Sequence, residues 1–353
     1  MRIAALIFSL TLLCLPAVAQ ELRLGIAAPL SGSFQMLGEQ WADGARVAAQ
    51  NGGTTVTFEI FDTRCDEDEA PALAARMVEA EVDAVAGFLC TPVAMAALPL
   101  LAEAGIPVVT PIRSTGLTDQ RQRSGFEVYR IGPRADEERA ALADILTERW
   151  REAFFAIVDD GTIYGRELAE TFRASAEEAE LEPVYVDTYR PQLENQIGLV
   201  GRLRRAGASH VMVGGDRTDI AIIARDAAEL GMSLTIAGGE ALRAESGGVP
   251  LAEGVLMVAP PLWEDLASEQ ALAALDEETV EPAGYVLPGY AAAEILISAH
   301  RRAQDEGGNI AEVLKRHSFN TAIGIVSFDE KGDRKQQLYR LYRYDGLAFQ
   351  EIE

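Results

Sequence analysis

The sequence predicts an α/β fold built as two similar lobes, each with a parallel sheet covered by helices. Short apolar runs, typical of buried strands, alternate with amphipathic helical stretches along most of the chain. The alternation begins at Leu22 and starts again near Glu127, although no residue-level repeat links the halves. With 353 residues, the chain is long enough for two domains.

The first set of predicted strands comprises 22–28, 55–62, 83–89 and 106–111. The helix after the first strand ends at Asn51-Gly52-Gly53, a typical helix stop. In the stretch DAVAGFLCTPVA (83–94), the third strand stops at Cys90 and a helix follows. We expect Thr91 to N-cap this helix, because threonine is a good cap and Pro92 suits the first turn.

The second set of predicted strands comprises 127–132, 153–160, 183–189, 209–215, 234–239 and 253–261, with a helix at 135–150 after the first of them. Further helices are predicted between about Glu264 and His317. The end of the chain is rich in strands, and its turn signals are Lys331-Gly332-Asp333 and Asp345-Gly346.

Several crossovers between the lobes are expected, near Gly132-Pro133, near Pro260-Pro261 and near Phe328. These boundaries predict lobe 1 as residues 20–132 plus 261–328, and lobe 2 as residues 133–260 plus 329–353. The two lobes are therefore expected to be interleaved in the chain rather than to follow one another as beads.

The N-terminal stretch MRIAALIFSLTLLCLPAVAQ predicts a secretory signal peptide, residues 1–19. It has a basic residue, Arg2, then an apolar stretch, and it ends on Ala17-Val18-Ala19 as a small-residue cleavage site. The apolar stretch is shorter than the ~20 residues that span a bilayer, so the mature chain is expected to be soluble and exported. A lipoprotein anchored through Cys14 is a weaker alternative.

The mature chain keeps Cys65 and Cys90, an even pair in an oxidising compartment, which predicts one disulfide. The three histidines, His210, His300 and His317, are scattered without the spacing of metal ligands, so no metal site is expected.

The formal net charge of −24 argues against a nucleic-acid partner, because phosphate binding needs clustered Lys and Arg. The sequence contains no G-x-S-x-G elbow, no G-x-x-x-x-G-K-[ST] loop, no G-x-G-x-x-G and no H-E-x-x-H. Nothing therefore predicts catalysis or a cofactor. An enzyme stays a disfavoured alternative.

Open α/β sheets bind ligands at the carboxyl ends of their strands, so the residues after each strand are informative. In the first half these include Thr91 and the loop that contains Ile112, Arg113 and Ser114. Both places offer backbone N–H groups and hydroxyls to a carboxylate. The alternative is that Thr91 and Ser114 merely cap helices or form turns.

In the second half, the strand ends bring Tyr164, Asp216 and Glu240. Glu240 follows a Gly-Gly turn and is well placed to receive an ammonium group, with a solvated loop carboxylate as the alternative. Tyr164 could instead be an ordinary packing aromatic, and Asp216 could cap the following helix.

At these residues the chain resembles the periplasmic solute-binding proteins of ABC importers for branched-chain amino acids, the leucine/isoleucine/valine-binding type. The markers, in this order and spacing, are IAAPLSGSFQMLGEQ (26–40), DTRCDEDEA (62–70), GFLCTP (87–92), IPVVTP (106–111), DDGTIYGRELA (159–169), AGGEAL (237–242), AEGVLM (252–257) and IGIVSFDEKGDRK (323–335). The resemblance implies the type I periplasmic binding protein fold, with two Rossmann-like lobes and a ligand cleft between them. It also implies a monomer in the periplasm that delivers its ligand to an inner-membrane permease.

The resemblance further implies roles for individual residues. In such proteins Cys65 would bond Cys90 and hold the start of the helix at Thr91 rigid. Thr91 and Ser114 would hold the ligand carboxylate, Ile112 would accept the ammonium through its carbonyl, and Glu240 would supply the counter-charge. Tyr164 and Tyr285 would line the pocket.

This sequence departs from the family pattern in the side-chain pocket. Leu37 and Asp216 stand where leucine binders have tyrosines, and Arg113 replaces a small residue. If both charges face inward, the ligand should carry polar or charged groups to match them. The alternatives are that Arg113 and Asp216 pair with each other, or that Arg113 turns outward.

These observations predict the substrate-binding component of an ABC transporter, which closes by a hinge on an amino acid or similar small ligand. The alternative is a receptor of the same fold that senses an amide, a urea or an aromatic acid. The sequence does not name the ligand.

Overall fold

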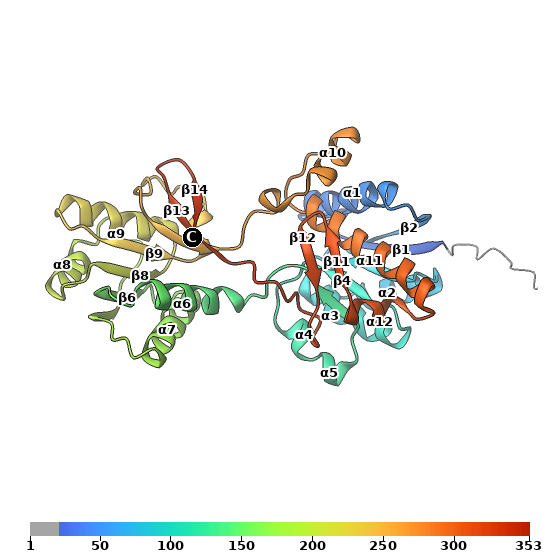
Figure 1. Cartoon of the computed structure of the whole chain (residues 1–353), viewed down its shortest axis with the longest axis horizontal. Coiled ribbons are helices and arrows are strands. Elements are labelled where there is room, and N and C mark those ends of the chain that lie inside the picture. The colour runs from blue at the N-terminus through green and yellow to red at the C-terminus, as the bar shows by residue number, and fades with distance from the viewer. Residues whose placement is uncertain (1–20) are drawn as a thin grey trace, which may run out of the picture.

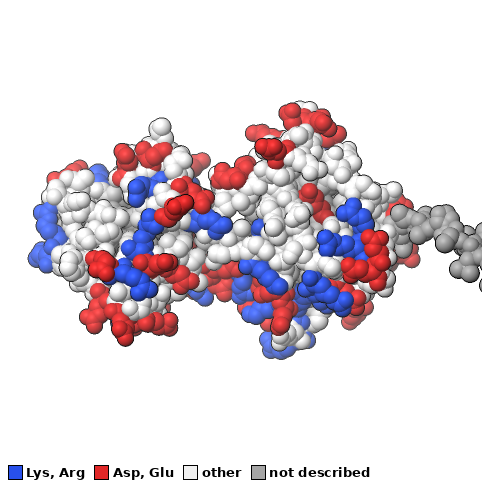
Figure 2. Space-filling view, in the orientation of Figure 1, with Lys and Arg blue, Asp and Glu red and all other residues white. Residues whose placement is uncertain are grey.

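The computed structural model describes residues 21–353, so the predicted signal peptide and Cys14 lie outside the described residues. The molecule is elongated, with two bodies side by side along its long axis (Figure 1). One body, lobe 1, is built on a five-stranded sheet, and the other, lobe 2, on a seven-stranded sheet. Acidic side chains spread over both bodies and mix with basic ones on the face in Figure 2.

The lobe 1 sheet is parallel throughout, in the order β2-β1-β3-β4-β5. Its strands are β1 (Leu22–Ala28), β2 (Val56–Asp62), β3 (Ala84–Gly87), β4 (Val108–Thr110) and β5 (Val128–Arg130). Helices α1 (Gln35–Asn51), α2 (Ala70–Glu79), α3 (Thr91–Glu103), α4 (Gly116–Asp119) and α5 (Arg121–Ser124) alternate with them. Parallel strands require such crossover connections, which explains the alternation in the sequence.

Chain from much later in the sequence completes lobe 1. The added elements are α10 (Glu269–Glu277), α11 (Val286–Glu306), α12 (Ile310–Arg316) and the antiparallel pair β11 (Ser318–Thr321) and β12 (Gly324–Ser327). Helix α11 packs closely on α1, where a Cβ on Gly44 would stand 1.9 Å from the Val286 carbonyl oxygen. Trp41 of α1 is fully buried there, and its indole N–H donates to the Ala86 carbonyl at 3.2 Å.

The lobe 2 sheet has the order β14-β13-β10-β9-β8-β6-β7. The parallel strands are β6 (Phe155–Asp159), β7 (Tyr185–Thr188), β8 (His210–Gly214), β9 (Thr235–Gly238) and β10 (Leu256–Ala259), and β13 (Arg340–Tyr344) and β14 (Phe349–Ile352) add an antiparallel edge. The helices are α6 (Glu137–Arg149), α7 (Ile163–Glu178), α8 (Ile197–Arg205), α9 (Arg217–Glu229) and η1 (Glu240–Arg243). The short helix η2 (Glu264–Leu266) follows the second connection, and its Leu266 packs against the core of lobe 1.

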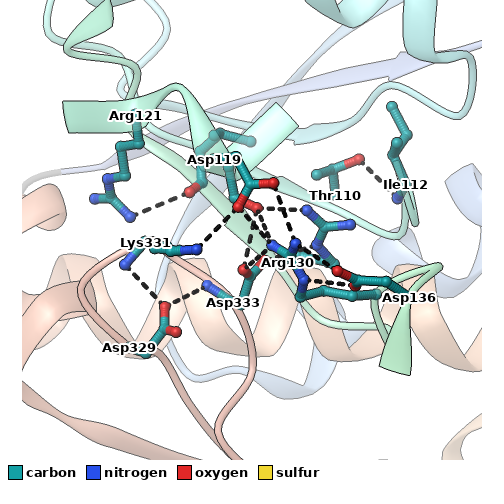
Figure 3. A network of polar contacts seen from close by, with 12 residues as sticks. Thr110, Ile112, Asp119, Arg121, Arg130, Asp136, Asp329, Lys331 and Asp333 are labelled. Carbon is teal, nitrogen blue, oxygen red and sulfur yellow. Dashed lines mark hydrogen bonds and ion pairs between the residues drawn. The ribbon is translucent and has the colours of Figure 1, made fainter. Parts of the chain in front are cut away.

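The chain passes between the lobes after β5, after β10 and between β12 and β13. A buried polar network joins the first and third passages (Figure 3). Arg130 is completely buried, and its Nε lies 2.8 Å from Asp333 Oδ1, while Arg134 Nη1 lies 2.8 Å from Asp333 Oδ2. One carboxylate therefore holds two guanidinium groups, and the two connections are fastened to each other.

One sequence expectation about local structure is corrected, and two turns are confirmed. Cys90, not Thr91, is the N-cap of α3: its backbone is extended and its carbonyl accepts the first helical hydrogen bond, from Ala94 N–H at 3.1 Å. The turn expected at Lys331-Gly332-Asp333 is present: Gly332 N–H donates to the Asp329 carbonyl at 3.1 Å, and Phe328 and Arg334 form an antiparallel bridge around it. The turn expected at Asp345-Gly346 joins β13 to β14.

The predicted disulfide is present between Cys65 and Cys90, with Cα atoms 5.6 Å apart. The cysteines follow β2 and β3, which are not adjacent, because β1 lies between them. The bridge therefore spans the end of β1 rather than joining neighbouring strands. Within residues 21–353, no helix combines the length and apolar character that crossing a membrane requires.

Candidate functional site

The two lobes meet at an ion pair between loops that follow parallel strands. Arg113 comes after β4 of lobe 1, and Glu240 begins η1 directly after β9 of lobe 2. Arg113 Nη1 lies 2.8 Å from Glu240 Oε1, and Nη2 lies 3.3 Å from Oε2. Arg113 Nη2 also donates to the hydroxyl of Tyr339 at 2.7 Å. The guanidinium thus links lobe 1 to two groups of lobe 2.

This pairing bears on the alternatives left open for Arg113, which are a pair with Asp216 across the closed cleft or an outward side chain. In this structure Arg113 forms its ion pair with Glu240. It therefore neither pairs with Asp216 nor turns outward without a partner. Burial by itself would lower the pKa of Arg113, but the hydrogen bonds and charge of Glu240 raise it overall. The side chains remain 38% and 27% exposed, so other charged groups can still reach them.

Sequence reasoning missed several residues at this site, among them Tyr339, Trp263 and Glu138, which lies near the start of α6. Its Oε1 accepts a hydrogen bond from Tyr164 Oη–H and another from the backbone N–H of Glu240, both at 2.7 Å. Burial, with the neighbouring Glu240 charge, raises the pKa of Glu138 to about 7. Glu138 therefore positions both Tyr164 and Glu240, and it can hold or release a proton near neutrality.

A cavity of about 320 Å³ opens beside the ion pair. All three connections between the lobes contribute to its wall, through Gly132, Pro261 and Leu338. Arg113, Glu240, Arg243, Trp263, Glu264 and Tyr285 also line it. An apolar wall with a few charged groups, at this size, suits a small organic ligand.

The remaining predicted residues lie outside the wall of this cavity. Ile112 is buried and its N–H donates to Thr110 Oγ1 at 3.2 Å, while Ser114 and Thr91 are half-buried at the ends of β4 and β3. The structure brings Arg113, Glu240 and Tyr285 to one cavity and joins Tyr164 to Glu240 through Glu138. Thr91, Ile112 and Ser114 belong to lobe 1 and are not among the residues that line the cavity.

Asp216 is the N-cap of α9 and accepts a hydrogen bond from Asp219 N–H at 2.8 Å. This matches the capping alternative that the sequence left open. The carboxylate is exposed and, in the part of the chain that the structure describes, forms no ion pair. No group of three or more His, Cys, Asp or Glu among residues 21–353 is arranged to hold a metal ion.

Comparisons with known proteins agree with this architecture. The model of the periplasmic binding protein family matches residues 21–348. The chain is 26% identical to Leu/Ile/Val-binding protein homolog 3 of Brucella melitensis, over 97% of this chain and 96% of that protein. It is 24% identical to the leucine-, isoleucine-, valine-, threonine-, and alanine-binding protein of Pseudomonas aeruginosa, over 92% and 90%.

Solved structures share the fold. A substrate-binding protein of Desulfitobacterium hafniense in complex with Leu has a TM-score of 0.66 and 21% identity, over 94% of this chain and 100% of that chain. A solute-binding protein of Rhodopseudomonas palustris in complex with benzoate has a TM-score of 0.56 and 20% identity, over 94% and 96%. The fold is therefore that of the type I binding proteins. Of the two solved structures, one contains Leu and the other contains benzoate.

Proposed function

This chain belongs to the periplasmic binding protein family, and we propose that it is the substrate-binding component of an ABC transporter for an amino acid. Relatives that match it over nearly their full length bear names of Leu/Ile/Val-binding proteins. The observation that carries the proposal is the cavity at the hinge, into which Arg113 from lobe 1 and Glu240 from lobe 2 both project.

In the proposed mechanism, residues 20–132 plus 261–328 and residues 133–260 plus 329–353 move as two lobes about the three connections. Glu240 pairs with the α-ammonium of the ligand, while Thr91 and Ser114 bring N–H and hydroxyl groups to its carboxylate. Because neither lobe can pair both charges, ligand favours the closed form over the open one. Ile112 and the rings of Tyr164 and Tyr285 would complete the pocket.

Arg113 gives this cycle a further step. Arg113 Nη1 pairs with Glu240 at 2.8 Å. The ligand ammonium must therefore share or displace the guanidinium. A carboxylate has about four acceptor positions, so both partners can be held during the exchange.

A thermal-shift screen of the mature protein against the twenty amino acids, followed by calorimetry on each hit, tests the function. We expect stabilisation by at least one α-amino acid, because a ligand that binds only the folded state raises its stability. Loss of binding on esterifying the α-carboxyl group, or on acetylating the α-amino group, would show that both poles are held. A screen with no hit overturns the proposal.

A sensor of aromatic acids is the second candidate. Trp263 and Tyr285 line the hinge cavity beside Arg113, an arrangement that suits an aromatic ring carrying a carboxylate. The structural neighbour from Rhodopseudomonas palustris holds benzoate. Stabilisation by benzoate or p-hydroxybenzoate, with no response to amino acids, would select this candidate. Genes for a permease and an ATPase beside this one would instead favour transport.

We further propose that the chain is exported to the periplasm, cleaved after Ala19, and acts as a monomer that binds without turning its ligand over. N-terminal sequencing of the periplasmic protein tests the cleavage site. Intact ligand recovered from the protein after overnight incubation tests the absence of turnover.

A further inference from the structure

Four aspartates gather at the edge of the lobe 2 sheet beside the hinge. Asp159 is the last residue of β6 and Asp160 follows it, while after β8 Asp216 is the N-cap of α9 and Asp219 lies in its first turn. None of their carboxylates takes part in an ion pair within the described chain, although many other acidic side chains of lobe 2 do. We call these four residues the acidic corner. Several negative charges held together without a counter-ion raise the energy of the site, and a cation would relieve it.

Tyr189, which follows β7, adds an independent observation. Its side chain is 3% exposed, and its hydroxyl has no hydrogen-bond partner among residues 21–353. A Cβ on Gly215 would stand 2.2 Å from this hydroxyl and 3.6 Å from the Cβ of Asp160, so the hydroxyl points into the acidic corner. Asp219 is 1% exposed, and its Oδ2 likewise lacks a hydrogen-bond partner in the part of the chain that the structure describes. Buried polar groups are normally satisfied, so two orphans at one place indicate a missing group.

We propose that the acidic corner binds a cationic group on the ligand side chain, and that the protein selects basic amino acids. This inference rests on the proposed function, since it places the α-ammonium of the same ligand on Glu240. An organic cation fits better than a metal ion, because in the described range these carboxylates do not converge as metal ligands do.

The order of the strands sets the distance between the two cation positions. Glu240 follows β9, Asp216 follows the neighbouring β8, and Asp160 follows β6, one strand further. Adjacent strands are about 4.8 Å apart, so the corner begins about 5 to 10 Å from Glu240 along the sheet edge. That span suits the aliphatic chain of lysine or the longer side chain of arginine.

The exposed members of the corner keep an oxygen for such a ligand. Asp160 uses Oδ1 for the N–H and the hydroxyl of Thr162, and Asp216 uses Oδ1 for the N–H of Asp219. Among the hydrogen bonds of residues 21–353, no donor bonds to Oδ2 of Asp160 or Asp216. Asp159, Asp219 and Tyr189 are buried. The two carboxylates would act on the ligand cation through their negative charge, and Tyr189 through its hydroxyl.

Calorimetry with lysine, arginine and norleucine tests this inference. Norleucine has the aliphatic chain of lysine without the terminal ammonium. We expect lysine or arginine to bind at least about tenfold more tightly than norleucine, as for a charge pair made on binding. The variant Asp216→Asn should abolish most of that difference and leave norleucine unchanged. Asparagine caps helices as well as aspartate does, so the fold is kept.

The matched control is Asp345→Asn, at an exposed turn in the β13–β14 connection, where the carboxylate also accepts backbone N–H groups. It removes the same charge and should change no affinity. If norleucine or leucine binds as tightly as lysine, or if Asp216→Asn weakens all ligands equally, the acidic corner is not a subsite while the proposed function survives. If no amino acid binds at all, the proposed function fails with it.

Discussion

The guanidinium of Arg113 and the carboxylate of Glu240 form an ion pair at 2.8 Å that joins the strand ends of two different sheets. The pair occupies the carboxylate that would hold the ammonium of an amino acid. Since both side chains keep contact with solvent, the pair is weak enough to exchange. It therefore holds the hinge in one geometry without closing the site to a ligand.

Arg113→Ala should increase the affinity for the amino-acid ligand, because the ammonium no longer competes with the guanidinium for Glu240. The gain should not exceed about tenfold, since partly exposed pairs are worth about 1 kcal/mol or less. Arg113→Lys keeps the charge and should stay close to the wild type. Weaker binding in calorimetry after Arg113→Ala would mean that Arg113 itself holds the ligand.

Glu240→Ala should weaken the binding of α-amino acids by at least about 2 kcal/mol, the scale for truncating one partner of a charge pair. Glu264→Gln is the control, because Glu264 lines the same cavity but forms no ion pair with Arg113. The pair of variants is measured by calorimetry. Equal affinities for Glu240→Ala and the wild type would remove Glu240 from the site.

Glu138 should make folding stability fall as the pH rises. Its pKa is about 7 in the fold and near 4.5 in the unfolded chain, so between these values the folded state holds a proton that the unfolded state has lost. The free energy of unfolding therefore decreases from pH 4.5 to pH 7, by on the order of 3 kcal/mol. Glu138→Gln should remove this part of the slope in urea titrations between pH 5 and pH 8.

Glu294→Gln is the matched comparison for Glu138, because burial also raises the pKa of Glu294 to about 7. Glu294 accepts from Ala322 N–H in lobe 1 and has no contact with Tyr164 or Glu240. Both variants should flatten the pH dependence of stability. Only Glu138→Gln should also change the pH dependence of ligand binding, and the same change in Glu294→Gln would contradict the positioning role.

Asp333→Ala should destabilise the protein by about 3 kcal/mol or more, because it leaves the buried Arg130 and the nearly buried Arg134 without their shared carboxylate. Asp119→Asn is the control, since Asp119 is the half-exposed outer partner of Arg134 and should matter by less than about 1 kcal/mol. Urea denaturation measures both. A similar loss of unfolding free energy in the two variants would show that the burial of the ion pair does not determine how much its removal destabilises the protein.

The disulfide should add about 3 kcal/mol to stability, because it closes a loop with a sequence separation of 25 residues. Intact mass of the exported protein with and without reductant should differ by two hydrogens. The double variant Cys65→Ser, Cys90→Ser should unfold at lower urea concentration. Two free thiols in the purified protein would rule the bridge out.

Local patterns predicted the elements well. The strand at 22–28 is β1 with the same bounds, and the helix expected at 135–150 is α6, Glu137–Arg149. Both depend on hydrophobic periodicity over a few residues, which is a property of the local sequence and does not depend on distant contacts. The error at Thr91 has the same origin: a cap is decided by one backbone conformation, and that of Cys90 is set by its tertiary neighbours.

The partners of the charged residues could not be predicted. Arg113 and Glu240 are 127 positions apart, and Glu138 lies 102 positions before the Glu240 N–H that it binds. In the sequence, Glu138 is one of two acidic residues in the first turn of a helix, where a solvated carboxylate is the ordinary expectation. Only the packing of α6 beneath the end of β9 buries it.

The sequence by itself determined which segments become strands and helices, that parallel sheets form, and which residues follow each strand, because these depend on short-range periodicity. The tertiary structure alone decided which charges neutralise one another: Arg113 pairs with Glu240, while Asp216 caps a helix and has no cationic partner among residues 21–353. The counter-ion of a charged side chain is the opposite charge that lies within a few ångströms of it after folding. The separation of two residues along the sequence does not determine their distance in the folded protein.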